Sequence, residues 1–317
     1  MKISIVGATG NVGSCAAFSI TEQRLADELV LIDDPRPDML ALHALDLNTA
    51  ATGHDMLVRA GHAEDMRDSN IVVIAAGSAK VVKSRLEVLP ANIPIVKSIC
   101  DDIERFCRDA VVITATNPVC PLNYGLSICS GLDRKKIIGY SYNDSIRFRM
   151  RVAEALGVRD SQVEGIVIGE HGNSQVLLFS SVRVDGRPVT FSEEMKRKLR
   201  QQVPDGQKTL GELREKTGRT AAWTTAVGLA TVCRAIVEDT GETIPCSLAL
   251  EGEYGYSKLS MSVPSVLGRG GVREIIEVEM AADEREDLKK SVGVLEPAMR
   301  YVEEFIKKSG YKTAEKK

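Results

Sequence analysis

The N-terminal segment, which ends at Asp33, constrains the fold more than any other stretch of this chain. An apolar, β-branched run at residues 2–6 is followed by a glycine at every third position of residues 7–13, and a second apolar run at residues 29–32 precedes Asp33. This order predicts a strand, a glycine turn, an amphipathic helix and a second strand. It is typical of the first unit of an α/β fold built on a parallel sheet.

Such a unit is suited to binding a dinucleotide. Glycines let the backbone approach a pyrophosphate closely, and the amides at the following helix N-terminus bind the phosphates. The carboxylate of Asp33 falls where a ribose hydroxyl pair would lie, and it repels a 2′-phosphate, which favours NAD over NADP. The alternatives are Asp34 as the acid, Arg36 as a partner for a 2′-phosphate, or a turn that binds no nucleotide. The predicted cofactor contacts in this segment are Gly7, Gly10, Asn11, Val12, Gly13 and Asp33.

The bulk properties are those of an ordinary globular protein. The chain has 317 residues, enough for two lobes of about 150 residues each. A net charge of −3 gives no general attraction to nucleic acid or to an anionic membrane. The seven cysteines include no C-x-x-C pair, and no histidine stands at metal-ligand spacing, so no metal site is predicted. The chain opens directly into a strand and contains no apolar run near about 18 residues, so we expect a cytoplasmic protein.

Strands and helices alternate through the first half of the chain. Strands are predicted at residues 70–77, 111–115 and 136–139, and helices at residues 38–49 and 86–107. The alternation predicts a Rossmann-type, doubly wound parallel sheet, with the ligand crevice beyond the carboxyl ends of the strands.

The pattern changes after residue 142. The predicted elements are a helix at residues 145–156, a β-rich stretch at 162–184, a helical region at 192–238, strands around Leu248, around Met261 and at 275–279, and a C-terminal amphipathic helix. We therefore predict an NAD-binding domain at residues 1–142 and an α+β substrate domain at residues 143–317.

His171 is the strongest candidate for acid–base chemistry. It follows an apolar strand, has glycines nearby on both sides, and carries an imidazole that titrates near neutrality. Asp144 and Arg147 are three residues apart at a predicted helix start and so share a face. A buried aspartate can orient an imidazole, and a guanidinium can hold a carboxylate through two parallel hydrogen bonds. Taken singly, the three also fit a structural histidine, a helix N-cap and a surface ion pair.

Taken together and in order, these motifs resemble the malate and lactate dehydrogenase family, in particular its lactate-dehydrogenase-like malate dehydrogenases of archaeal or bacterial type. The motifs are residues 7–13 with Asp33, Ser84-Arg85, residues 116–119, residues 144–149 and residues 168–174, with residues 250–255 and 263–272 extending the resemblance toward the C-terminus.

The resemblance implies a role for each candidate. His171 would exchange a proton with the substrate hydroxyl, Asp144 would orient the imidazole, and Arg147 would hold the substrate carboxylate. Arg85, on a loop that closes over the site, would polarise the carbonyl and exclude water, and Asn117 would bind the substrate or the nicotinamide ribose. The implied substrate-binding residues are Lys80, Arg85, Asn117 and Arg147, and the further cofactor contacts are Gly77, Asn92 and Asn117.

Several positions depart from the family pattern. The loop at residues 77–85 is one residue shorter than usual and offers Lys80 where malate enzymes have arginine. Lysine can neutralise a second carboxylate but cannot clamp it through two bonds, so we expect malate to be preferred over lactate with weaker discrimination. Asn143 replaces an apolar residue, Cys120 stands where aspartate is frequent, and residues 220–223 lie where the family closes its pocket.

Two kinds of function therefore stand. The first is an NAD-dependent dehydrogenase of a small 2-hydroxy acid, with (S)-malate and oxaloacetate preferred over lactate or another acid. The second is a non-catalytic, nucleotide-binding member of the same fold. The resemblance also implies a homodimer or homotetramer, with neither nucleic acid nor a membrane as a partner.

Overall fold

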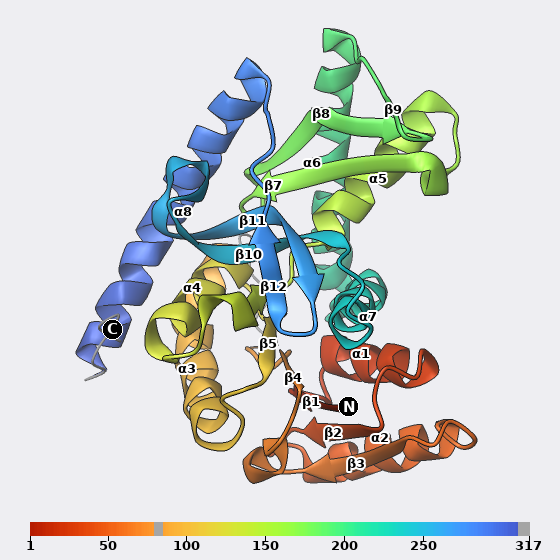
Figure 1. The fold of residues 1–317 in the computed structure, drawn as a ribbon, viewed down its shortest axis with the longest axis vertical. Helices are drawn as coiled ribbons and strands as arrows, with labels where there is room; N and C mark the ends of the chain where they lie inside the picture. Colours follow the sequence, from red (N-terminus) through yellow and green to blue (C-terminus); the bar gives the residue numbers. More distant parts are fainter. Residues whose placement is uncertain (79–84, 310–317) are drawn as a thin grey trace.

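The structure, a computed structural model, describes residues 1–78 and 85–309 (Figure 1). Within these residues the strands join into one 12-stranded sheet of order β3-β2-β1-β4-β5-β6-β10-β11-β7-β8-β9, and β12 pairs with β11. The strands are β1 Lys2–Val6, β2 Glu28–Ile32, β3 Leu57–Gly61, β4 Ile71–Ile74, β5 Val111–Thr114, β6 Ile137–Gly139, β7 Val163–Gly169, β8 Gln175–Val184, β9 Arg187–Pro188, β10 Thr243–Glu251, β11 Ser257–Gly268 and β12 Gly271–Ile275.

The helices agree with the predicted regions but differ at several ends, and α4 was not predicted. They are α1 Asn11–Glu22, α2 Pro37–Ala50, α3 Leu89–Phe106, α4 Val119–Cys129, α5 Asn143–Leu156, α6 Glu193–Thr217, α7 Trp223–Val237 and α8 Ala282–Lys308, with short 3-10 turns η1 Ala63–Met66, η2 Arg85–Val88, η3 Arg134–Lys136, η4 Asp160–Gln162 and η5 Glu253–Gly255. The helix expected to begin at Leu86 begins at Leu89, because η2 precedes it and Pro90 suits a first helical turn. The helical region at residues 192–238 is two helices, because Gly218 ends α6 in the left-handed conformation.

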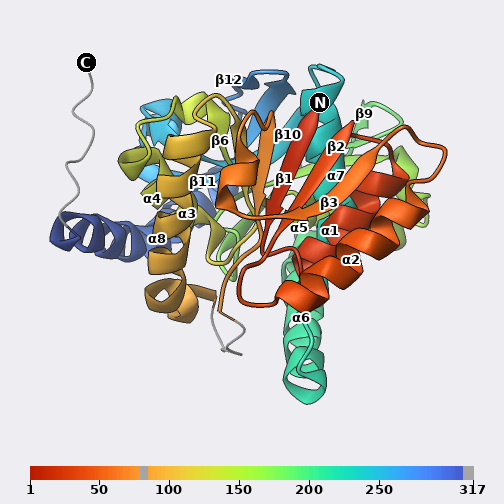
Figure 2. The same cartoon turned by 90° about the horizontal axis from the view of Figure 1, so that it is seen from below.

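The first half has the predicted doubly wound topology. The pairs β2·β3, β1·β2, β1·β4, β4·β5 and β5·β6 are all parallel. Figure 2 shows α1 and α2 on one side of these strands and α3 and α4 on the other. Both faces are therefore covered, and β4 and β5 consist of fully buried residues. Their carboxyl ends meet at one edge, where the ligand crevice of such folds lies.

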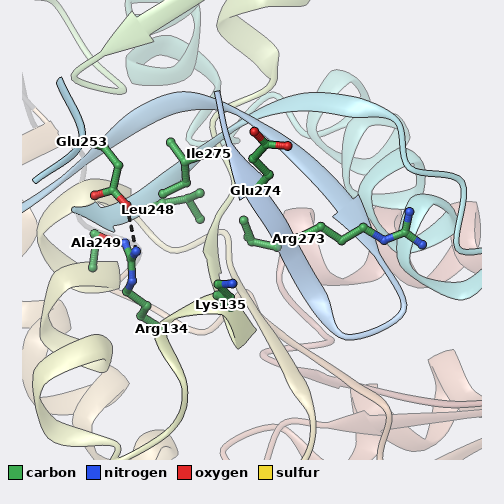
Figure 3. A pocket seen from close by; sticks show the side chains of 9 residues that line it. Arg134, Lys135, Leu248, Ala249, Glu253, Arg273, Glu274 and Ile275 are labelled. Carbon is green, nitrogen blue, oxygen red and sulfur yellow. Dashed lines mark hydrogen bonds and ion pairs between the residues drawn. The ribbon is translucent and has the colours of Figure 1, made fainter. Parts of the chain in front are cut away.

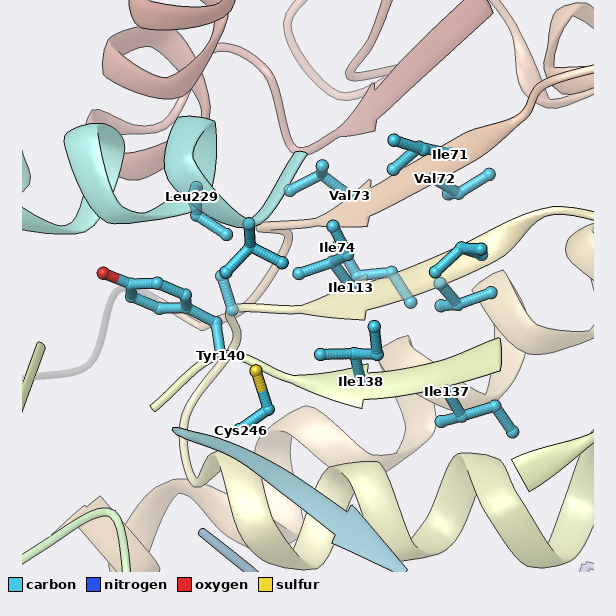
Figure 4. Close-up of a cluster of buried hydrophobic side chains, with 14 of the residues drawn as sticks. Ile71, Val72, Val73, Ile74, Ile113, Ile137, Ile138, Tyr140, Leu229 and Cys246 are labelled. Carbon is cyan, nitrogen blue, oxygen red and sulfur yellow. The ribbon is translucent and has the colours of Figure 1, made fainter. Parts of the chain in front are cut away.

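The sheet continues without a break into the second half. Gly139 of β6 pairs with Ser247 of β10, and Ser262 of β11 pairs with Gly169 of β7. Figure 4 shows buried side chains of β4, β5 and β6 meeting Leu229 of α7. Helix α1 packs on α7 and α4 packs on α8, so one hydrophobic core joins elements of both halves. The division into domains at residue 142 remains a prediction.

One predicted strand lies earlier in the chain than expected. The strand expected at residues 275–279 is observed at Gly271–Ile275, so the prediction overlaps it only at Ile275. Beyond it, the side chain of Tyr254 replaces a strand neighbour: its hydroxyl donates to the carbonyl of Ile276 at 2.7 Å and accepts from the amide of Val278 at 3.2 Å. Among the described helices, none combines the length and apolar character needed to cross a bilayer.

The cysteines are free thiols, and all except Cys15 are buried. Burial raises the pKa of Cys107 and Cys120 to about 11 and that of Cys233 and Cys246 to about 12, so these thiols stay protonated near neutral pH. We expect Ellman's reagent to react rapidly with one thiol, Cys15, in the folded protein and with all seven in guanidinium. Rapid native reaction of several thiols would contradict this burial.

Candidate active site

The glycine turn is closely packed at both ends and open in the middle. Gly7 has φ +86°, and a Cβ on it would lie 2.4 Å from the amide nitrogen of Ala76. A Cβ on Gly13 would lie 2.2 Å from the carbonyl oxygen of Gly7, whereas one on Gly10 would meet only that oxygen, at 3.4 Å. Gly7 and Gly13 are thus needed to pack the turn, and the space over Gly10 is open to a ligand.

This open space lies at the N-terminus of α1, which begins at Asn11. The first helical hydrogen bond of α1 runs from the amide of Ser14 to the carbonyl of Gly10, at 2.9 Å. The amides of Asn11, Val12 and Gly13 precede that bond and lie where an α-helix has donors without intrahelical acceptors. Together with the helix dipole, they form a site that fits a pyrophosphate.

Asp33 lies beside the same turn, at the end of β2. The amide of Thr9 donates to Oδ2 of Asp33 at 3.0 Å, and the Thr9 hydroxyl donates to the same oxygen. Both bonds fall on Oδ2 and hold the carboxylate in place, so Oδ1 is the atom suited to a ribose hydroxyl. The alternative acid, Asp34, pairs instead with His62, 3.0 Å from its Nδ1. Arg36 lies at the start of α2 and is exposed.

Asn92 ties two loops at the sheet edge to α3. Its Oδ1 accepts from the amide of Ser78 at 2.7 Å, and its Nδ2 donates to the carbonyl of Asn117 at 2.6 Å. Gly77 packs closely against Thr116, because a Cβ on Gly77 would lie 2.8 Å from Cγ2 of Thr116. Oδ1 of Asn117 is buried and has no hydrogen-bond partner among the described residues. A buried acceptor without a partner is rare, so this oxygen is suited to a donor from a ligand.

His171, Asp144 and Arg147 meet at one place, although a strand and a turn separate them along the chain. Nδ1 of His171 donates to Oδ2 of Asp144 at 2.6 Å, and both side chains are at least 95% buried. Nη1 of Arg147 donates to Oδ1 of Asp144 at 3.3 Å, and the Arg147 side chain remains 21% exposed. The carboxylate therefore orients the imidazole with one oxygen and the guanidinium with the other.

The loop that carries His171 is held by contacts that the sequence analysis did not predict. Ser291 of α8 accepts from the amide of Glu170 at 2.8 Å, and Glu170 accepts from the amide of Ser174 at 2.9 Å. The amide of His171 donates to the thiol sulfur of Cys120 at 3.4 Å. Ser291 lies 121 residues from Glu170, so no local pattern could have revealed this contact.

The remaining predicted residues are only partly described. Arg85 begins η2, directly before α3, and its side chain lies outside the described part of the structure. Lys80 falls in residues 79–84, which also lie outside it. In the described ranges, no group of three or more His, Cys, Asp and Glu side chains is arranged to hold a metal ion.

A cavity of about 230 Å³ lies between η3, β10 and β12 (Figure 3). It lies at the amino end of β6, opposite the edge at which His171 and Asp144 meet. Its Arg134 already donates to Glu253 at 2.7 Å and to the carbonyl of Ala249 at 3.0 Å, so the protein itself neutralises this cation. This cavity is therefore a poorer candidate for an anionic substrate than the place where Arg147, Asp144 and His171 meet.

Two family profiles match the chain. The profile described as lactate/malate dehydrogenase, NAD binding domain, matches residues 1–139. The profile described as lactate/malate dehydrogenase, alpha/beta C-terminal domain, matches residues 143–306.

Individual proteins match over nearly the same length. The malate dehydrogenase of Natronomonas pharaonis is 37% identical over 283 residues, which cover 88% of this chain and 92% of that protein. The L-lactate dehydrogenase of Halalkalibacterium halodurans is 33% identical over 300 residues, which cover 93% and 95%. The crystal structure of Cryptosporidium parvum malate dehydrogenase has a TM-score of 0.88 at 28% identity, covering 96% of this chain and 99% of that chain.

Proposed function

Since this chain belongs to the lactate/malate dehydrogenase family, we propose that it interconverts (S)-malate and oxaloacetate with NAD as the cofactor. The chain is an NAD-binding oxidoreductase of that family, and its substrate is a small molecule. Malate is favoured over lactate because the relatives of 36–37% identity are named malate dehydrogenases, and because Lys80 supplies positive charge for a second carboxylate.

The observation that carries this proposal is the contact of His171 with Asp144. With Nδ1 held by the carboxylate, Nε2 is the nitrogen that exchanges a proton with the substrate. As the alcohol is oxidised, its hydroxyl proton passes to Nε2, and Asp144 stabilises the resulting imidazolium. In the reverse direction Nε2 returns that proton to the carbonyl oxygen.

Arg147 would bind the carboxylate next to the reacting carbon. Its bond to Asp144 fixes one side of the guanidinium, and its partial exposure leaves other N–H groups available for two parallel bonds to a carboxylate. Arg85 is proposed to polarise the substrate carbonyl and Lys80 to neutralise the second carboxylate of malate.

The residues of the first half fit NAD. We propose that Gly10, Asn11 and Val12 hold the pyrophosphate, that Asp33 binds the ribose, and that Asn117 binds the nicotinamide ribose or the substrate. Asn92 and Gly77 are proposed to position the two loops that border this site, at Ser78 and Asn117. When bound, NAD supplies the hydride acceptor of the reaction.

The direct test is turnover of a panel of 2-oxo acids. We expect NADH absorbance to fall with oxaloacetate and to fall more slowly with pyruvate and longer 2-oxo acids. Faster turnover of pyruvate would favour the lactate dehydrogenase alternative, to which the L-lactate dehydrogenase relatives belong. Tight NADH binding with no turnover of any acid would favour the non-catalytic alternative.

Replacing Lys80 tests the choice between malate and lactate. In Lys80→Gln the second substrate carboxylate loses its countercharge, so the ratio of kcat/KM for oxaloacetate to that for pyruvate should fall roughly tenfold. Lys83→Gln, in the same loop, is the matched control. An unchanged ratio in Lys80→Gln would show that another residue faces the second carboxylate.

Replacing Asp33 tests the cofactor choice. Asp33→Asn keeps an oxygen that can accept from Thr9 but removes the charge that repels a 2′-phosphate. We expect KM for NADH to rise and KM for NADPH to fall, so that the preference for NADH shrinks about 10-fold or more. Asp34→Asn, next along the chain, should leave the preference unchanged, whereas the opposite pattern would assign the ribose to Asp34.

A cytoplasmic location and a homodimer or homotetramer belong to the same proposal. The assembly is implied by the family resemblance, and sedimentation of the purified protein would measure its size.

A further inference from the structure

A buried hydrogen-bond network joins the residue before Asp144 to the start of α7. The hydroxyl of Tyr140 donates to Oδ1 of Asn143 at 2.5 Å, and Nδ2 of Asn143 donates to the hydroxyl of Thr225 at 2.8 Å. The Tyr140 hydroxyl also lies 3.5 Å from the carbonyl oxygen of Thr224. Asn143 is the first residue of α5, and Asp144 follows it.

The network contains buried polar groups that need hydrogen-bond partners. Tyr140 is 2% exposed and Asn143 is 4% exposed, so each polar group would destabilise the fold without its partner. Burial raises the pKa of Tyr140 well above its ordinary value, so its hydroxyl stays protonated and can donate to Asn143. Figure 4 shows the Tyr140 ring reaching past the aliphatic cluster toward α7. There Gly228 makes room for it, because a Cβ on Gly228 would lie 1.9 Å from the Tyr140 hydroxyl oxygen.

The same segment is tethered at its other end to the dinucleotide turn. Nδ2 of Asn11 donates to the carbonyl of Thr220 at 3.4 Å. Residues 220–225 therefore run from the proposed pyrophosphate site to the neighbour of Asp144. An apolar residue at position 143 could fill the same buried space without needing polar partners. It could not form the hydrogen bond to Thr225 that fixes the rotation of α7 and its position along the helix axis. Trp223, the sole tryptophan, lies at the first position of α7 and is 83% exposed.

We propose that Tyr140, Asn143 and Thr225 form a positioning clamp that fixes the start of α7 relative to Asp144 and so sets the fit of the substrate beside residues 220–225. The residues of the clamp are positioning residues, because none of them exchanges the proton or holds the substrate carboxylate. The inference deepens the proposed function and rests on it for its kinetic consequence. Its structural consequence, a fixed start of α7, does not depend on turnover.

The kinetic test uses a matched pair at Thr225. Thr225→Val is isosteric and removes the hydroxyl, whereas Thr225→Ser keeps it. Thr225→Val and Asn143→Leu are expected to raise KM for oxaloacetate about 3- to 10-fold, as for the loss of one buried hydrogen bond, while kcat changes less than about twofold. Thr225→Ser should retain the wild-type KM. Tyr124→Phe, which removes a tyrosine hydroxyl bonded to Glu303 at 2.6 Å on α8, should change neither constant.

The structural test uses the fluorescence anisotropy of Trp223 in the folded protein without substrate. Thr225→Val and Asn143→Leu should lower the anisotropy, while Thr225→Ser and Tyr124→Phe should keep the wild-type value. Equal anisotropy in all variants would overturn the clamp, and so would a fall in kcat with no change in KM. If the wild-type protein turns over no 2-oxo acid, the proposed function fails, and the Trp223 anisotropy alone decides whether the clamp exists.

Discussion

Replacing His171 by glutamine is expected to lower kcat about 10²- to 10⁴-fold, the usual contribution of one well-placed general acid–base. The glutamine amide can form hydrogen bonds, but it does not take up a proton near neutral pH. Asp144, 2.6 Å from Nδ1 in the native site, would then have no imidazolium to stabilise. Steady-state rates of NADH oxidation by oxaloacetate measure the effect.

The control for this substitution is His54→Gln, because His54 lies in the turn between α2 and β3, at the sheet edge away from the site. It should leave kcat unchanged. Binding of NADH, followed by fluorescence, should be the same in His171→Gln as in the wild type, because His171 is not among the proposed cofactor contacts. A kcat within about tenfold of wild type would assign the proton transfer to another group.

Replacing Arg147 by lysine is expected to lower kcat/KM roughly 10- to 150-fold, equivalent to about 1.5–3 kcal/mol for a hydrogen bond to a charged group. Lysine keeps the positive charge but cannot offer two parallel N–H groups in the plane of a carboxylate. It also cannot keep the geometry by which Nη1 of Arg147 contacts Oδ1 of Asp144 at 3.3 Å. Both losses should raise KM for oxaloacetate and also lower kcat, because the substrate is held less firmly before the imidazole.

Arg151→Lys is the matched control, since Arg151 lies one turn further along α5 and pairs with Glu154 at 2.7 Å. It changes the same chemical group on the same helix and should leave kcat/KM within about twofold, as for an exposed ion pair. Near-wild-type kinetics of Arg147→Lys would show that the substrate carboxylate binds elsewhere.

The alternating half of the chain was predictable because its signals are local. Each strand is a short apolar run, each turn carries glycine or proline, and consecutive strands of such a fold lie near one another. The parallel order and the placement of Asp33 beside the glycine turn are therefore confirmed. The ends of elements were predicted less closely, in both halves. The bounds of η2 in the first half, and the division at Gly218 and the end of β12 in the second, depend on capping and on side-chain contacts such as those of Tyr254.

The site shows the same division between what was predictable and what was not. His171, Asp144 and Arg147 were chosen from residue type and from resemblance, and the structure brings all three together. Asn143 and Cys120 were noticed only as departures from the family pattern. The structure gives Asn143 two hydrogen-bond partners, the buried Tyr140 and the half-buried Thr225, and the Cys120 sulfur accepts from the amide of His171. No sequence pattern pointed to Ser291, which accepts from the amide of Glu170.

The sequence by itself therefore determined the Rossmann-type half and the cofactor class, because each depends on spacing within one strand, turn or helix. It pointed to His171 as the proposed acid–base residue only through residue type and resemblance. Only the tertiary structure decided that one carboxylate contacts both His171 and Arg147, that α8 holds the loop that carries His171, and that the start of α7 is bonded to α5. These contacts join residues up to 121 positions apart, and hydrogen bonds of about 3 Å depend on the packing of whole elements rather than on any local pattern.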